Sequence, residues 1–384
     1  MSGWLHLTRW IAAMAVVVTH VNNRLFVRFA AIPKAGRSPM VYAWTFVTGF
    51  GHQAVMVFFV MSGYLIGGSV LRELRQTGGL DLSGYLVKRV VRLAVVLWPA
   101  LLLGALFDRA GLALDPTGSV YMTVVGDVLG PTTLVCNAAF LQTVVCPMYG
   151  SNGALWSLSA ELWYYILWPM ILLPVMSSRS LRAKVACIAM AILLSVGLSL
   201  ARFAEQAIVP YMAVWALGVL PFVRTRPLLG RTTAHAGAIF IAILVGVRIG
   251  VRSEAWSDPV LGFILDMLVA ACFANFLIAL RHDDRREALP GTRVYRWAAD
   301  FSYSLYSIHL PVISVLGAIA VSQLGMRWSA VPSGIGAWLT AFAYVAAAVL
   351  AAYLFSLLTE RNTAVVRRWV TTLWARRSSR GAQR

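Results

Sequence analysis

The chain has 384 residues, of which 59% are hydrophobic and 12% charged, and its mean hydropathy is +0.74. This composition excludes a soluble globular protein, because several runs reach the roughly 20 apolar residues needed to cross a ~30 Å hydrocarbon core. The formal net charge is +18, but Lys and Arg gather between the apolar runs and in the C-terminal tail, as expected beside anionic lipid headgroups. We therefore predict an all-α, polytopic membrane protein that contacts membrane lipid and has no nucleic-acid partner.

Apolar stretches predict a bundle of about ten transmembrane helices. We expect them at roughly 5–22, 50–70, 90–107, 154–174, 184–201, 207–223, 236–251, 259–280, 301–322 and 334–358. The first has no cleavage site after it, which predicts an uncleaved span. Segment 129–146 is apolar but interrupted, and we expect a short re-entrant or interfacial helix there. The organisation predicts one transmembrane domain over 1–360 and a basic cytoplasmic tail over 361–384.

Basic residues in alternate connections predict the orientation. Lys and Arg gather in 71–92, 179–184, 224–231, 281–296 and the tail, whereas 108–153, 202–206, 252–258 and 323–333 contain fewer. The positive-inside rule therefore predicts that both termini are cytoplasmic. Connection 23–49 is the exception, since it contains Arg24, Arg28, Lys34 and Arg37 and is predicted to face outside.

The first span contains two residues that ordinary membrane helices avoid, Arg9 and His20. They are eleven residues apart, so at ~100° and ~1.5 Å per residue they project within roughly 20° of one face, about 16 Å apart along the axis. An ionisable group inside a bilayer indicates a functional site. The alternative is that Arg9 extends to the interface and His20 makes hydrogen bonds in a loop.

The second and third spans contain further motifs. Phe58 and Phe59 precede Ser62-Gly63-Tyr64-Leu65, a small-residue notch that helix packing alone explains well. Arg89 and Arg92 are i,i+3 neighbours at the predicted cytoplasmic boundary of the third span. Such a pair can bind phosphates bidentately, or it can be ordinary positive-inside anchoring.

Glu161 and His309 are the ionisable residues that we single out in the fourth and ninth spans. Glu161 follows Trp156-Ser157-Leu158-Ser159-Ala160 at the predicted outer edge, the side that His20 also approaches. A carboxylate there can orient an imidazole, or it can be a hydrated interfacial glutamate. His309 precedes Pro311, which frees an upstream carbonyl, and a structural role is the simpler interpretation of this histidine.

The four cysteines show no metal-binding spacing, and we expect no metal. Cys187 and Cys272 lie within apolar runs and are expected to be buried. Cys136 and Cys146 lie in one loop, where they either form a disulfide, if the loop faces outside, or remain free.

Taken together, these motifs resemble the acyltransferase-3 family of bacterial membrane-bound O-acyltransferases. The resemblance rests on five motifs that occur in the family's order over roughly residues 5–325. They are Arg9 with His20, Phe58-Phe59 with Ser62–Leu65, Arg89 with Arg92, the WSLSxE string ending at Glu161, and Ser302–Pro311. The chain resembles the stand-alone form without an SGNH esterase-like domain.

The resemblance implies that an acyl group, usually acetyl from acetyl-CoA, is transferred to a hydroxyl of a surface or secreted carbohydrate at the bacterial inner membrane. We predict that His20 is the proton-accepting base, oriented by Glu161, because a sugar hydroxyl needs a base and imidazole has a suitable pKa. Arg89 and Arg92 would bind the CoA phosphates at the cytoplasmic face. Arg9 would contact the CoA or the thioester oxyanion, and His309 is a second candidate for positioning the donor.

Two other classes of protein are also consistent with the sequence. Intramembrane Arg, His and Glu also line the paths of transporters and flippases, although no paired halves are found in the sequence. A scaffold without chemistry would leave Arg9, His20 and Glu161 in separate places. The sequence leaves open the acceptor, acetyl against succinyl or a longer acyl group, direct transfer against an acyl-histidine intermediate, and the oligomeric state.

Overall fold

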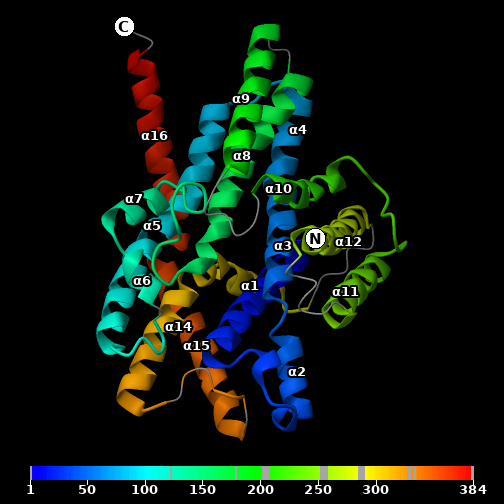
Figure 1. Ribbon diagram of the computed structural model, residues 1–384. Helices are drawn as coiled ribbons and strands as arrows, with labels where there is room; N and C mark the ends of the chain where they lie inside the picture. Colours follow the sequence, from blue (N-terminus) through cyan, green and yellow to red (C-terminus); the bar gives the residue numbers. More distant parts are fainter. Residues whose placement is uncertain are drawn as a thin grey trace. The chain divides into compact units, whose positions relative to one another are not determined.

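We describe a computed structural model of the protein (Figure 1), which covers residues 2–121, 123–177, 180–200, 208–250, 258–283, 290–326, 328, 330–332 and 334–381. Its helices are α1 Ser2–Leu25, α2 Pro39–Val47, α3 Gly51–Ser62, α4 Gly68–Thr77, α5 Leu82–Leu114, α6 Thr123–Asp127, α7 Pro131–Ala138, α8 Trp156–Met176, α9 Leu181–Ser199, α10 Ile208–Leu217, α11 Thr233–Gly250, α12 Pro259–His282, α13 Thr292–Ala299, α14 Ser302–Leu324, α15 Gly334–Leu358 and α16 Thr363–Gly381. Within these residues we find no strand, and the predicted all-α fold is confirmed.

Nine helical stretches among the described residues are long and apolar enough to cross a membrane. The predicted span 207–223 corresponds to a shorter apolar stretch, Ile208–Phe222. The predicted external connections 202–206 and 252–257 lie outside the described residues. The chain is therefore a multi-pass membrane protein, while its sidedness stays a prediction.

Two spans are longer than their apolar cores suggested. The stretch predicted at 50–70 is helical over Gly51–Thr77, with a π-helical turn at Gly63–Gly67, and the one predicted at 90–107 extends over Leu82–Leu114. Backbone hydrogen bonding continues into polar turns that a hydropathy window does not include. The apolar segment 129–146 contains the short helix α7, as expected.

The chain divides into two compact units, each of which is described by itself. Unit 1 comprises Met1–Ala12, His52–Leu86 and Ala160–Tyr295, and unit 2 comprises Ala13–Gly51, Val87–Ser159 and Arg296–Arg384. In unit 1, α12 packs against α10 and α11; in unit 2, α14 packs against α15. The predicted boundary at residue 360 between a transmembrane domain and a tail stays a prediction.

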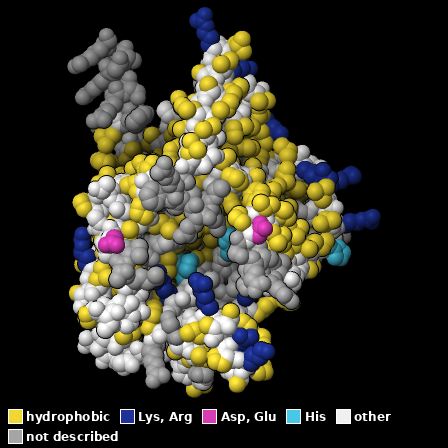
Figure 2. Space-filling view, in the orientation of Figure 1, with side chains coloured by type: hydrophobic (Ala, Val, Ile, Leu, Met, Phe, Trp, Pro, Cys, Tyr) yellow, Lys and Arg dark blue, Asp and Glu magenta, His cyan; other side chains and the backbone are white. Residues whose placement is uncertain are grey.

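Helix α9 of unit 1 presents apolar side chains that other described residues leave uncovered. They include Leu181, Val185, Ile192, Leu193 and Val196, each more than half exposed. Hydrophobic side chains are also prominent on the face shown in Figure 2. In a bilayer such a surface contacts lipid tails at no cost, which fits the membrane class.

The small-residue notch Ser62–Leu65 lies at a close contact between two helices of unit 1. A Cβ built on Gly63 would lie 1.8 Å from the backbone oxygen of Trp215, and one on Gly218 would lie 2.0 Å from the backbone oxygen of Val60. Both glycines therefore let α3 and its π-helical turn approach α10 backbone to backbone.

Gly63→Ala is expected to lower the stability of the protein by about 1–3 kcal/mol or more, because backbone rather than a flexible side chain must move. Gly246→Ala in α11 is the matched control, since its Cβ would meet nothing within 4 Å. The measurement is the melting temperature of each purified variant in detergent. Equal melting temperatures for the two variants would contradict the close approach.

In unit 2, a disulfide joins Cys136 and Cys146 and closes the loop between them, which resolves the alternative that the sequence left open. Asn137 lies buried inside this loop, where its Nδ2 donates to the carbonyls of Thr133 (2.9 Å) and Pro147 (3.0 Å). The cross-link and the buried amide together hold the loop that precedes α8.

Asp115 organises the turn that follows α5. Its carboxylate accepts hydrogen bonds from the backbone N–H groups of Ser119 (2.9 Å), Val120 (2.8 Å) and Tyr121 (2.8 Å), and from the Thr117 hydroxyl. Burial opposes the charge, but these hydrogen bonds outweigh it and hold the pKa of Asp115 below its usual value.

Asp115→Ala is expected to lower the stability of the protein by about 1–3 kcal/mol at neutral pH, since the buried N–H groups of Val120 and Tyr121 lose their acceptor. Because the pKa of Asp115 is lower in the folded protein than in the unfolded chain, the ionised carboxylate stabilises the fold at pH values above the unfolded pKa of about 4. This stabilisation is lost as the pH falls through the lower pKa of the folded protein. The difference in melting temperature between wild type and variant should therefore be constant near pH 7 and shrink in acid. Asp127→Ala, at an exposed position of α6, is the control and should show no such difference.

Candidate functional site in unit 2

His20 and His309 lie side by side in unit 2. His20 Nδ1 is 2.9 Å from His309 Nε2, and the ring centroids are 5.0 Å apart. His20 is half-buried on α1, whereas His309 on α14 is fully buried. The first and the last sequence motif therefore meet at one imidazole pair.

The hydrogen bonds of His309 determine the tautomers of both rings. Its Nδ1 lies 3.0 Å from the carbonyl oxygen of Leu305 and 2.9 Å from that of Tyr306. A carbonyl only accepts, so Nδ1 carries the proton and Nε2 of the neutral ring is an acceptor. His20 then donates its Nδ1–H to His309, which leaves the lone pair of the neutral His20 ring on Nε2. This arrangement makes His20 Nε2 the basic atom of the pair.

Pro311, which follows His309 in α14, frees an upstream carbonyl, as predicted from the sequence. Pro311 cannot donate to the carbonyl of Ser307, and this oxygen instead accepts a 2.7 Å hydrogen bond from Asn152 Nδ2. One residue earlier, the Tyr306 hydroxyl donates to the carbonyl of Ala154 (2.8 Å) and lies 2.6 Å from the Ser157 hydroxyl. The segment leading into α8 thus holds the turn of α14 that carries His309.

A charged network close to the imidazole pair was missed by the sequence analysis. Asp108 of α5 is buried and accepts hydrogen bonds from the backbone N–H (2.8 Å) and the hydroxyl (2.6 Å) of Ser151. Tyr121 Oη donates to the same carboxylate (3.3 Å), and burial and Asp108 both raise the pKa of Tyr121, which stays a donor. Arg24 interacts electrostatically with Asp108 and with both imidazoles. Its position four residues after His20, on the same helix face, is the signal that could have found it.

Arg89 and Arg92 both lie in the part of α5 that belongs to unit 2. Arg89 is half-buried and Arg92 is exposed. Their spacing of three residues within one continuous helix keeps both guanidinium groups on one side of α5, as the sequence predicted. Their role as phosphate ligands stays a prediction.

Glu161 belongs to unit 1, where it has hydroxyl partners. Ser62 Oγ donates to Glu161 Oε1 (2.6 Å), Tyr165 Oη donates to the same oxygen, and Trp215 Nε1 donates to Ser62 Oγ (3.1 Å). The SGYL motif and the end of the WSLSxE motif therefore meet at this carboxylate. Arg9, in the first part of α1, is half-buried and also belongs to unit 1.

Of the six predicted site residues, the structure brings His20 and His309 into direct contact. Both ring nitrogens of His309 already have partners inside the protein, so His309 is placed to position His20. The predicted contact between His20 and Glu161 stays a prediction, as do the roles of Arg9, Arg89 and Arg92.

An imidazole pair within membrane-spanning helices, with one basic nitrogen set by hydrogen bonds, is an acid–base site of the kind that a membrane-embedded enzyme uses. A family model described as an acyltransferase domain, acyltransferase-3, matches residues 2–357. The chain belongs to this family, and it is a multi-pass membrane acyltransferase.

Two relatives agree with the family assignment. The chain is 30% identical over 147 residues to "Putative peptidoglycan O-acetyltransferase YrhL" of Bacillus subtilis (strain 168), which covers 36% of this chain and 22% of that protein. It is 25% identical over 352 residues to "Nodulation protein 10" of Rhizobium leguminosarum bv. viciae, covering 86% and 87% of the two chains. The matched part thus spans about a fifth of the Bacillus protein. No solved structure matches the chain.

Proposed function

We propose that this enzyme moves an acyl group, most often acetyl, from acyl-CoA to a hydroxyl of a surface or secreted carbohydrate. The observation that carries the proposal is the hydrogen bond between His20 Nδ1 and His309 Nε2, because it leaves a proton-accepting nitrogen inside an acyltransferase. The name of the Bacillus relative supports a glycan acceptor.

In the proposed reaction His20 Nε2 takes the proton of the acceptor hydroxyl as its oxygen attacks the thioester carbonyl carbon. The carbon–sulfur bond then breaks, and the CoA thiolate leaves and takes the proton. His309 accepts the Nδ1–H bond throughout, so it fixes the His20 tautomer and stabilises the imidazolium that forms. We prefer this positioning role for His309 to direct contact with the donor, since its side chain is fully buried.

The remaining residues have supporting roles in the proposal. Arg89 and Arg92 hold the CoA phosphates, because guanidinium groups bind phosphate oxygens bidentately. Arg9 contacts the CoA or stabilises the thioester oxyanion. Glu161 keeps its predicted role as an orienting carboxylate.

We propose the bacterial inner membrane as the location, with acyl-CoA delivered from the cytoplasm and the acceptor outside. The Cys136–Cys146 disulfide supports this orientation, because disulfides persist on the oxidising side of a membrane and the connection 108–153 is predicted to face outside. Both named relatives come from bacteria.

The test uses purified protein in detergent with acetyl-CoA and envelope carbohydrate from the deletion strain as acceptor, and measures release of the free CoA thiol. An enzyme releases thiol without a membrane gradient, whereas a transporter or flippase does not. Deletion of the gene should in parallel remove a base-labile acyl ester from one glycan fraction, which identifies the acceptor. Thiol release indistinguishable from buffer, with an unchanged glycan, would overturn the proposal.

A further inference from the structure

The connection between the first two predicted spans is the exception to the positive-inside pattern, and it lies within unit 2. Residues 23–49 contain Arg24, Arg28, Lys34 and Arg37 and no Asp or Glu, although the connection is predicted to face outside. Cations on the outer side oppose the orientation that the other connections favour. Their presence there indicates that these charges serve a function of their own.

Part of this connection folds into a compact loop, residues 28–37, which we call the basic loop. The backbone N–H of Arg37 donates to the carbonyl of Lys34 (3.2 Å), and Arg37 Nε donates to the carbonyl of Ile32 (2.8 Å). The guanidinium carbon of Arg37 lies 4.8 Å from the centre of the Phe29 ring. Ile32 is buried beneath the loop. These contacts hold the loop together, so its cations are kept in fixed places.

The basic loop begins close to the imidazole pair. The backbone N–H of Val27 donates to the carbonyl of Ala330 (3.1 Å), and the N–H of Ala330 donates to the carbonyl of Leu25 (3.1 Å), which anchors the loop at the end of α1. His20 lies five residues before Leu25, about 8 Å along the helix axis. Arg24, one turn after His20, interacts electrostatically with both imidazoles. The cations of the connection therefore start beside the proposed base and continue into the basic loop.

The charges of the basic loop have no counter-charge among the described residues. Arg28 and Lys34 are exposed, and their side chains make no hydrogen bond or ion pair with any residue that the structure describes. Asp108 and Asp115 of the connection 108–153 are buried and already accept hydrogen bonds from their own segment. A positive surface without carboxylate partners attracts anions from outside the protein.

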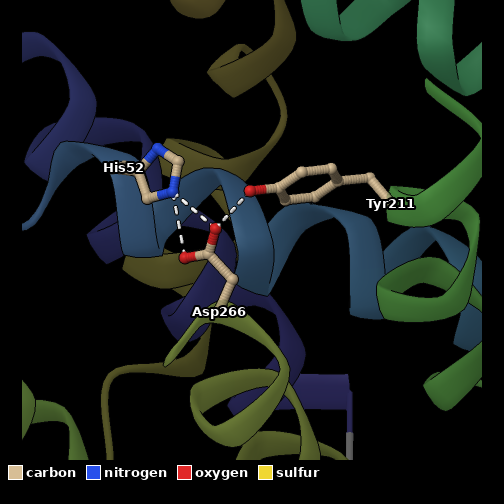
Figure 3. Close-up of polar contacts among 3 residues, drawn as sticks. All are labelled: His52, Tyr211 and Asp266. Atoms are coloured by element: carbon tan, nitrogen blue, oxygen red, sulfur yellow. Dashed lines mark hydrogen bonds and ion pairs between the residues drawn. The ribbon is translucent and has the colours of Figure 1, made fainter. Parts of the chain in front are cut away.

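The buried ionisable cluster of unit 1, in contrast, has its partners inside the protein (Figure 3). His52 Nε2 lies 2.9 Å and 2.8 Å from the two carboxylate oxygens of Asp266, and the Tyr211 hydroxyl donates to Asp266 Oδ2 at 2.6 Å. This carboxylate is satisfied by neighbouring side chains and calls for no ligand. The basic loop has no such neighbours, so its counter-charge comes from a bound anion.

We propose that the basic loop binds anionic groups, carboxylate or phosphate, of the carbohydrate acceptor, so that the enzyme acylates an anionic glycan in preference to a neutral one. The proposal rests on the proposed function, because that function supplies the acceptor and the outward orientation. Arg28 and Lys34 contact the anionic groups, since guanidinium and ammonium groups both bind them. Arg37 holds the loop, and no covalent bond forms or breaks there. The position beside His20 favours the acceptor over lipid headgroups, because the acceptor alone has to reach the base from outside.

The experiment measures thiol release from acetyl-CoA by purified full-length protein, in non-ionic detergent and in vesicles with or without phosphatidylglycerol. The acceptor is envelope carbohydrate of the deletion strain, separated by anion exchange into an anionic and a neutral fraction. Wild type should use the anionic fraction. Its KM for this fraction should rise several-fold between about 0.05 and 0.3 M salt, because salt screens exposed charges.

Three double variants test the loop itself. Arg28→Gln with Lys34→Gln should raise the KM for the anionic fraction about tenfold and remove most of its salt dependence, with kcat and the KM for acetyl-CoA unchanged. Arg28→Lys with Lys34→Arg keeps both charges and should stay within about threefold of wild type. Arg182→Gln with Lys184→Gln, at the start of α9, removes the same charge from a connection predicted to be cytoplasmic and should match wild type.

The outcomes separate this proposal from the proposed function. If wild type releases no thiol with either fraction, both proposals are wrong. If wild type uses the neutral fraction equally well, or shows no salt dependence, the role of the basic loop alone is wrong. A raised KM for acetyl-CoA in the Gln variant would assign the loop to the donor instead. A defect seen only in vesicles with phosphatidylglycerol would assign it to lipid headgroups, and either result overturns the proposal. Should the Gln variant fail to accumulate, the fraction preference and salt dependence of wild type still test it.

Discussion

His20→Ala is expected to lower acyl transfer at least about 100-fold, because a sugar hydroxyl is a poor nucleophile unless a base removes its proton. The variant should still insert in the membrane, since His20 is half-buried and its loss removes two hydrogen bonds, to His309 and to the backbone of Val16. The measurement is the restoration of base-labile acyl groups in the deletion strain, normalised to the amount of protein in the membrane.

The control for this variant is the same substitution at another histidine. His235→Ala should retain wild-type acylation, which shows that loss of an imidazole elsewhere in the chain has no effect. If His20→Ala retained activity within about tenfold of wild type, the loss would be too small for a general base, and the assignment would be wrong.

The polar residues of the site could be predicted from the sequence because ionisable side chains are rare in helices that cross a membrane. His20, His309 and Glu161 interrupt apolar helices, and an ionisable group that persists there needs a function or a partner. The same criterion marks Asp266 equally well, but Asp266 lies in none of the five motifs and the sequence analysis did not single it out. Its partner His52 has no periodic or compositional signal of its own.

The pairing of these residues could not be predicted, because it depends on tertiary structure. His20 and His309 are separated by 289 positions, and their contact requires that α1 and α14 lie side by side, which neither motif encodes. Glu161 was predicted to orient His20 because the two residues share a depth along their spans, and this pairing stays a prediction. Depth alone does not predict the hydroxyl partners that Glu161 has within unit 1, Ser62 and Tyr165.

The number and type of helices were predicted more closely than their ends. Hydropathy identifies apolar cores, so it found every long span, but the helices continue through polar turns such as the one after Gly68. The segment 207–223 was predicted as a full span, although its apolar helical stretch, Ile208–Phe222, is short. Its α-helix ends at Leu217, and Pro221 lies in a separate 3₁₀ turn, Leu220–Phe222, a break that a hydropathy average does not detect.

His309→Leu is expected to lower acyl transfer on the order of 100-fold, because an imidazole without its orienting partner loses its fixed tautomer. Leucine fills most of the buried space on α14 but accepts no hydrogen bond from His20 Nδ1. His309→Gln restores an acceptor oxygen and should recover at least about a tenth of wild-type activity. A merely structural role for His309 would rank the two variants the other way, since Leu suits a buried apolar site better than Gln. Acylation in the deletion strain and the melting temperature in detergent should therefore be measured together: Leu more stable and less active, Gln less stable and more active. If activity followed stability in both variants, His309 would be a packing residue, and the fixed tautomer of His20 would not explain its basicity.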